Sequence, residues 1–189
     1  MSSLISPKTC AVLLCIFLIL PNPAIAQEAV LTNIIVTNTR DDLLVYLNVE
    51  GAFSEKIKDV IISGVPVTFS FFLTLYRIRG LWFDKQIADI KVTHTIKYDN
   101  LKKGFHVKRS WGNSKPVITQ SFEQAQKLMA EIDSLKILPL GKLEKGKNYQ
   151  IRTKAELSKL TLPFYLHYVF FFVSLWDFET DWYTIDFTY

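Results

Sequence analysis

The chain has 189 residues, of which 49% are hydrophobic, and its formal net charge is +4. This length is sufficient for one domain with a substantial core. The small excess of Lys and Arg is spread along the chain, which argues against a nucleic-acid partner.

The first 26 residues have the pattern of an export signal. Lys8 precedes an apolar stretch over residues 11–20, and Ala-Ile-Ala at 24–26 resembles a cleavage site. The stretch is about half as long as a helix that crosses a bilayer. We therefore expect a signal peptide over 1–26, a single β-rich domain over 27–189, and an exported protein in the periplasm or on the periplasmic face of the envelope. Both cysteines lie in the leader, so we expect no disulfide.

The next segments alternate between apolar and polar residues, as β-strands do. Residues 31–37 and 43–49 predict an opening hairpin around the turn formers NTRDD at 38–42. Ser54, a good N-cap, and Gly64, a good closing residue, then bracket a short predicted helix.

Two longer strands are predicted next, over residues 65–79 and 87–99, followed by a returning strand from Phe105 to Trp111. A capping box of Ser121 and Gln124 then opens a second helix with an apolar stripe. This stripe contains Phe122, Ala125, Leu128, Met129 and Ile132.

The last predicted strands cover residues 135–138, 149–157 and 182–189, and the first two of these are expected to pair with each other. With about eight strands and two short helices, the fold class is mainly β (α+β). It is expected to be an antiparallel β-sandwich or a curled sheet.

The segment from Phe164 to Trp176 is apolar on all sides. It is short for a transmembrane span, so burial in the core is the leading interpretation, and contact with a membrane is the alternative. Acids then alternate with aromatic residues, and this pattern predicts a binding surface. Its members are Trp176, Asp177, Phe178, Glu179, Asp181 and Trp182.

Carboxylates two residues apart project to one side of an extended chain, where they could bind a cation or a sugar beside the tryptophans. The segment does not match a calcium-binding loop, because Trp182 occupies the position that requires glycine. His94 falls on the apolar side of its strand, which favours a core histidine with satisfied hydrogen bonds. We expect no cofactor and no metal.

The usual nucleophile and nucleotide-binding motifs are missing, which favours a noncatalytic protein. One alternative is a hydrolase that uses carboxylates such as Asp177, Glu179 or Asp181. Another is a small outer-membrane β-barrel, since the alternation of Tyr183, Ile185, Phe187 and Tyr189 is typical of a closing barrel strand.

Four stretches carry a resemblance to a known family: TRDDLLVYLNVEGAF (39–53), FFLTLYRIRGLWFD (71–84), HTIKYDNLKKGF (94–105) and SLWDFETDWY (174–183). The chain resembles the exported bacterial proteins of domain of unknown function 4390. This family has no assigned activity, cofactor or catalytic residue, so the resemblance assigns no functional role to any residue of this chain. The resemblance also implies that related genes neighbour a two-component sensor kinase, which suggests a link to signalling.

These observations predict an exported, noncatalytic envelope protein that acts as a binding or interaction module. Its contact surface is expected to be formed by the C-terminal aromatic residues. The expected partner is an envelope protein or a membrane surface, because Trp and Tyr favour such interfaces.

Overall fold

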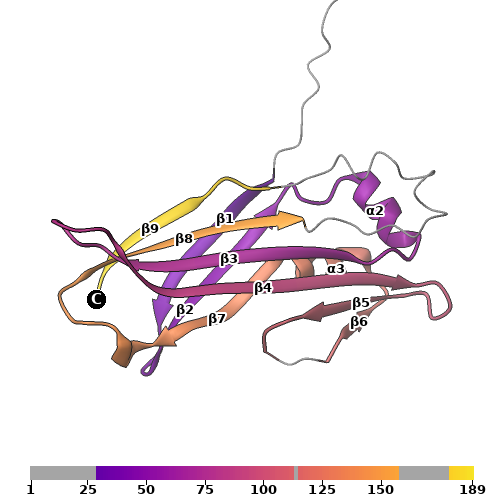
Figure 1. The fold of residues 1–189 in the computed structure, drawn as a ribbon. Coiled ribbons are helices and arrows are strands. Elements are labelled where there is room, and N and C mark those ends of the chain that lie inside the picture. The colour runs from indigo at the N-terminus through magenta and orange to yellow at the C-terminus, as the bar shows by residue number, and fades with distance from the viewer. Residues whose placement is uncertain (1–28, 113–114, 158–178) are drawn as a thin grey trace, which may run out of the picture.

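Two antiparallel β-sheets make up the part of the chain that the structure describes, which comprises residues 29–112, 115–157 and 179–189 of a computed structural model. The larger sheet has the strand order β6-β5-β4-β3-β8-β9, and the smaller has the order β1-β2-β7 (Figure 1). The larger sheet is open, with β6 and β9 as its edges. The strands are β1 (Val30–Asn38), β2 (Asp42–Glu50), β3 (Val67–Arg77), β4 (Lys85–Asp99), β5 (Gly104–Arg109), β6 (Val117–Thr119), β7 (Glu131–Pro139), β8 (Asn148–Leu157) and β9 (Tyr183–Thr188), and the helices are α2 (Glu55–Ile62), α3 (Phe122–Ala130) and the short 3-10 helix η1 (Leu140–Lys142).

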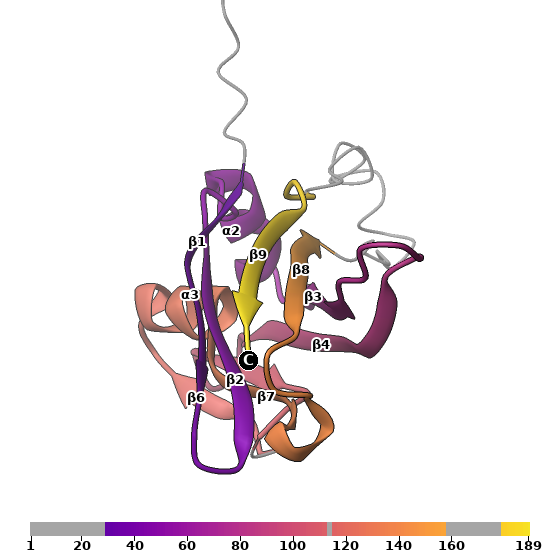
Figure 2. The same cartoon turned by 90° about the vertical axis from the view of Figure 1, so that its left-hand side faces the viewer.

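The two sheets share one hydrophobic core, and their strands cross obliquely (Figures 1 and 2). Strand alternation builds this core, because every second residue of a strand faces the same side of its sheet. The predicted fold class, mainly β with an antiparallel β-sandwich or a curled sheet, is therefore confirmed. The inward residues of the central strands include Val67, Phe69, Phe71, Leu73 and Leu75 of β3, Tyr149, Ile151, Thr153, Ala155 and Leu157 of β8, and Leu43, Val45, Leu47 and Val49 of β2.

Both outer strands of the smaller sheet contain a β-bulge, which changes the side of the sheet that the following side chains face. Asn33 in β1 and Ser134 in β7 have positive φ angles of 51° and 56°, and the register of each strand shifts beside them. Such bulges change which residues face inward. Beyond the bulge in β1, Ile34 and Val36 pack on the core, while Ile35 is exposed.

Both helices begin at the serines that the sequence predicted. Ser54 Oγ accepts the Ile57 N–H at 3.4 Å, and Ser121 Oγ accepts the Gln124 N–H at 3.2 Å. The predicted capping box is only half formed, because the Gln124 side chain accepts a hydrogen bond from Thr119 Oγ1 at 2.6 Å. Helix α3 lies against β5 and β4, beside the core.

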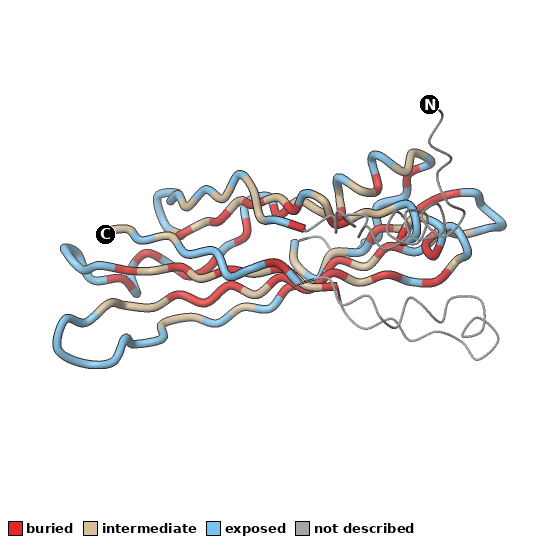
Figure 3. Tube along the Cα trace, turned by 90° about the horizontal axis from the view of Figure 1, so that it is seen from above, coloured by how far each residue is buried: buried red, intermediate tan, exposed pale blue. Residues whose placement is uncertain are grey.

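Buried side chains follow the middle of the strands, whereas the hairpin ends are exposed (Figure 3). None of the described helices is both long enough and apolar enough to cross a bilayer. The segment from Phe164 to Trp176, for which the sequence left core burial and membrane contact open, lies outside the described residues.

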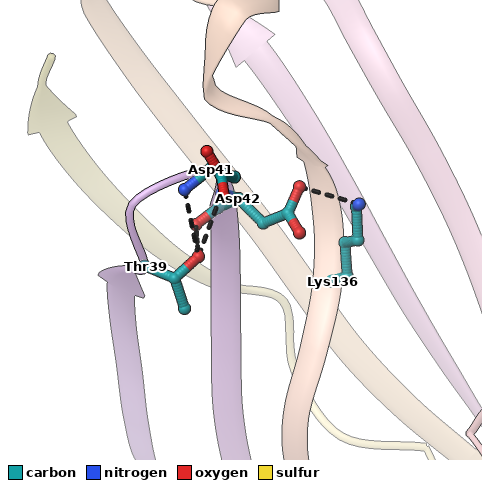
Figure 4. A network of polar contacts seen from close by, with 4 residues as sticks. All are labelled: Thr39, Asp41, Asp42 and Lys136. Carbon is teal, nitrogen blue, oxygen red and sulfur yellow. Dashed lines mark hydrogen bonds and ion pairs between the residues drawn. The ribbon is translucent and has the colours of Figure 1, made fainter.

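The β1–β2 turn is fixed by side chains of the predicted turn segment (Figure 4). Thr39 Oγ1 accepts the backbone N–H groups of Asp41 and Asp42 at 3.3 and 3.0 Å. Lys136 of β7 reaches Asp42 Oδ1 at 2.7 Å, and the Leu140 N–H donates to the Asp41 carbonyl at 2.8 Å. These contacts connect the hairpin to β7, its neighbour in the smaller sheet.

The pairing predicted between residues 135–138 and 149–157 is wrong. Strand β7 pairs with β2 in the smaller sheet, and β8 pairs with β3 and β9 in the larger one. The short helix η1 and the turn after it carry the chain from one layer to the other. Strands that are close in sequence often form a hairpin, which is why β7 and β8 were expected to pair. Each strand instead pairs within a different sheet and turns its apolar face toward the shared core.

Candidate binding surface

The outer face of the larger sheet, opposite the core, carries rings and cations in neighbouring rows. Phe72 of β3 lies between Lys91 of β4 and Lys154 of β8 in the strand register. Two residues along, Thr74 lies opposite Arg152, and then Tyr76 lies opposite Gln150. Strand β9 continues the rows on the other side of β8, where Thr184 lies opposite Arg152. We call the following residues the outer-face cluster: Phe72, Thr74, Tyr76, Lys91, Gln150, Arg152, Lys154, Trp182 and Thr184.

Cations stack on the aromatic rings throughout this cluster. The Arg152 guanidinium lies 4.6 Å from the Tyr76 ring centre, and Lys91 Nζ lies 4.8 Å from the Phe72 ring centre. Lys154 Nζ lies 5.4 Å from Phe72 and 5.1 Å from Trp182. Each contact is attractive, because the face of an aromatic ring carries negative electrostatic potential. The contacts therefore hold the long cationic side chains in place on the sheet.

Lys154 also connects the cluster to the chain segment that precedes β9. Its ammonium group donates a short hydrogen bond to Glu179 and lies 3.8 Å from Glu156 Oε2. The hydrogen bond to Glu179 is the largest cause of a raised Lys154 pKa. Next to Glu179, Thr180 exchanges hydrogen bonds with the backbone of Ala155 at 2.9 and 3.0 Å. This segment is therefore fastened to the edge of β8.

A hollow of about 500 Å³ lies on the cluster, lined by Thr74, Tyr76, Gln150, Arg152, Trp182 and Thr184. Trp182 remains 52% exposed beside it. Arg152 Nε donates to Gln150 Oε1 at 2.6 Å, and one of its terminal nitrogens lies 4.0 Å from Asp84 Oδ2. A guanidinium has five N–H donors, so others remain for a ligand. The hollow therefore combines an apolar ring, hydroxyl groups and a cationic donor.

The structure describes three of the six residues that the sequence predicted as a binding surface. Trp182 and Glu179 both contact Lys154. Asp181 is exposed and lines a second cavity of about 240 Å³, to which Trp182 and Ala29 also contribute. Trp176, Asp177 and Phe178 lie outside the described residues.

The carboxylates do not form an acid–base pair in the described residues. Glu179 and Glu156 converge on one ammonium group, that of Lys154, and form an ion-pair network with it. Across residues 29–112, 115–157 and 179–189, no three His, Cys, Asp or Glu side chains gather closely enough to hold a metal ion.

Sequence reasoning missed Tyr76, Phe72 and Arg152 as members of the surface. The alternation of residues 149–157 does place Arg152 and Lys154 on the outer side of their strand. It does not show which strands flank them. The rings supplied by β3 enter the surface only through the β3–β8 pairing.

A comparison with protein families gives a match for most of the chain. The model described as domain of unknown function (DUF4390) matches residues 26–186. The chain belongs to this family. The DUF4390 match spans every described strand at least in part, so the resemblance seen in the sequence is confirmed. No curated protein and no solved structure matches the chain.

Proposed function

We propose that this DUF4390 protein is an exported, noncatalytic binding module of the bacterial envelope. It recognises an envelope protein through the outer-face cluster, with Trp182 at its centre. The partner presents an apolar side chain to Trp182 and a carboxylate or carbonyl group to Arg152. The family match begins at residue 26, next to the expected signal cleavage site, and this agreement supports export.

The half-exposed Trp182 carries the proposal. A tryptophan that is fixed by a cation on one side and open to solvent on the other offers a large apolar contact at small entropic cost, because it is already ordered. Trp and Arg are the residues that most often dominate the energy of protein interfaces. Here Trp182 and Arg152 line the same hollow.

The hydrolase alternative has weaker support. It needs one carboxyl group that keeps a proton and another that stays ionised across a substrate pocket. Glu179 instead bonds to Lys154, and Asp181 lines a different cavity. A sensor kinase remains a partner to test, on the family resemblance alone.

Site-directed photocrosslinking in living cells tests the proposed surface. A benzophenone amino acid placed at Thr184, inside the hollow, should form a discrete adduct in the envelope fraction. Trp182→Ala and Arg152→Glu should each reduce that adduct about tenfold or more, which is typical of a residue at the centre of an interface. Point variants are preferable to truncation, because β9 is part of the sheet.

The control is Leu101→Ala, which removes an exposed apolar side chain from the β4–β5 turn, at the end of β4 away from the hollow. It should leave the adduct at Thr184 unchanged. An adduct that survives both Trp182→Ala and Arg152→Glu in folded protein would refute the outer-face cluster as the binding surface. Mass spectrometry of the wild-type adduct identifies the partner, including a sensor kinase.

A further inference from the structure

The turn between β3 and β4 presents three large apolar side chains to solvent. Leu81 is 100% exposed, Trp82 is 75% exposed and Phe83 is 87% exposed. Figure 1 shows this hairpin projecting beyond its neighbours at one end of the molecule. Exposed apolar side chains that lie next to one another lower solubility. Such a group on a protein surface therefore indicates a site of contact with a partner or a membrane.

The turn is a closed loop. Arg79 donates its backbone N–H to Asp84 Oδ1 at 3.2 Å, which brings together the two sides of the loop. Before the loop, the Ile78 N–H donates to the Asn148 carbonyl at 2.9 Å, and the Arg77 side chain pairs with Glu144. The three apolar residues therefore lie at the apex of an anchored hairpin.

Cations are frequent at this end of the molecule. The β3–β4 connection, taken with its flanking strand residues as 77–85, and the β7–β8 connection, taken with the first residue of β8 as 140–148, meet at this end, as the pairing of Arg77 with Tyr149 shows. The two connections carry six cationic and two acidic side chains. Both acids are engaged, Asp84 by the loop and Glu144 by Arg77. The cations are Arg77, Arg79, Lys85, Lys142, Lys145 and Lys147.

We propose that the β3–β4 turn docks the protein on an anionic lipid bilayer. Leu81, Trp82 and Phe83 enter the interface between headgroups and acyl chains, where tryptophan is favoured. Arg79, Lys85 and the lysines of the β7–β8 connection bind the lipid phosphates. The charge around the apex selects lipid over a second copy of the chain, because two such ends would repel each other.

This surface adjoins the outer-face cluster where Asp84 lies 4.0 Å from Arg152, but its apex residues are not members of that cluster. The anionic headgroups attract the cations of the two connections, and burial of the apex supplies the apolar part of the binding. The turn at the opposite end of β4 also carries cations, Lys102 and Lys103, but it lacks a comparable group of apolar residues. It carries one exposed leucine, Leu101, and the 15 residues of β4 separate the two ends by about 50 Å.

Vesicle flotation of the chain as recovered from the expressing cell tests the proposal, with its first residue determined by mass spectrometry. The probes are vesicles of phosphatidylglycerol with phosphatidylethanolamine, and vesicles of phosphatidylcholine alone. The wild type should float with the anionic vesicles. The triple variant Leu81→Ser, Trp82→Ser, Phe83→Ser should lose about tenfold or more of this binding. All three side chains are exposed, so the triple variant should remain folded.

Charge is tested separately from apolar contact. Arg79→Gln and Lys85→Gln should each weaken binding to the anionic vesicles about fivefold, the contribution of one cation near such a surface. Trp82→Phe should keep most of the binding but lose the blue shift of tryptophan emission. The chain has four tryptophans, so loss of the shift in this variant assigns the signal to Trp82.

Two control variants test whether vesicle binding belongs to the β3–β4 turn. Leu101→Ser removes an exposed leucine from the opposite turn and should leave binding unchanged, whereas Leu81→Ser should weaken it several-fold. Trp182→Ala should also leave vesicle binding unchanged, so failure of lipid docking is distinguishable from failure of the outer-face cluster.

Three results would overturn lipid docking. In the first, the wild type does not prefer anionic vesicles. In the second, the triple serine variant binds as well as the wild type. In the third, sedimentation shows that the wild type self-associates and the triple variant does not, which would make a second copy of the chain the occupant.

Discussion

His94 should make the protein less stable in mild acid. It lies in the core on β4, where Trp111 Nε1 donates to His94 Nε2 at 2.8 Å. The other ring nitrogen, Nδ1, therefore carries the proton and donates to the Met129 carbonyl at 2.9 Å. The imidazole is neutral in this arrangement. The sequence-based expectation of a core histidine with satisfied hydrogen bonds is confirmed.

Burial lowers the pKa of His94 from its ordinary value of 6.5 to about 4, and Arg109 acts in the same direction. The hydrogen bond to Met129 opposes this shift without reversing it. The unfolded chain therefore binds more protons than the folded one between pH 6.5 and pH 4. Stability is fully present above pH 6.5 and falls as the pH drops through this window.

The size of the loss follows from the shift. Each pKa unit corresponds to 1.36 kcal/mol, so the full effect is about 3 kcal/mol. Between pH 7 and pH 4.5 the free energy of unfolding should fall by roughly 2 kcal/mol through His94. This is a large part of the stability of a typical domain.

Urea unfolding at pH 7 and at pH 4.5 measures this loss in the wild type and in His94→Gln. Glutamine keeps polar groups at this position but does not titrate. The carboxylates titrate in both proteins, so the difference between the two pH dependences isolates His94. Equal pH dependences in the two proteins would refute the assignment of a buried, neutral histidine.

Three substitutions test other contacts by urea unfolding at neutral pH. Thr39→Val should cost about 0.5–1 kcal/mol, because it removes the acceptor that fixes the β1–β2 turn. Gly64→Ala should cost about 1–2 kcal/mol, because φ is +87° and the new Cβ would lie 3.2 Å from Asn100 Nδ2. Tyr149→Phe should cost about 1–2 kcal/mol, because the buried hydroxyl accepts the Glu144 N–H at 2.8 Å.

Each of these variants has a control of the same chemical type. Thr37→Val lies on the exposed side of β1, Gly141→Ala has open space around the new Cβ, and Tyr76→Phe alters a half-buried ring. The controls should change the free energy of unfolding by less than about 0.5 kcal/mol. A control that costs as much as its partner would show that the named contact is not the cause.

Local signals in the sequence predicted most of the elements. Alternation identifies the strands because each has one apolar face, and Ser54 and Ser121 identify the helix starts because their hydroxyls replace missing backbone acceptors. The bulges at Asn33 and Ser134 could not be predicted in this way. Each is a single residue that shifts the alternation, and neither is a glycine.

The surfaces were harder to predict than the elements. Trp182 was singled out because acids and aromatic residues alternate around it, but its contacts come from strands far away in the sequence. The exposure of the apolar residues Leu81 and Phe83 could not be predicted from the sequence. Their composition is typical of a core, and only the position of the β3–β4 turn exposes them.

The residues on either side of 158–178 are neighbours on the sheet. Glu179 pairs with Glu156, and Thr180 is hydrogen-bonded to Ala155, so β9 is positioned by contacts at its own start. The placement of β9, and with it one wall of the hollow, therefore depends on Thr180, a residue that does not itself line the hollow.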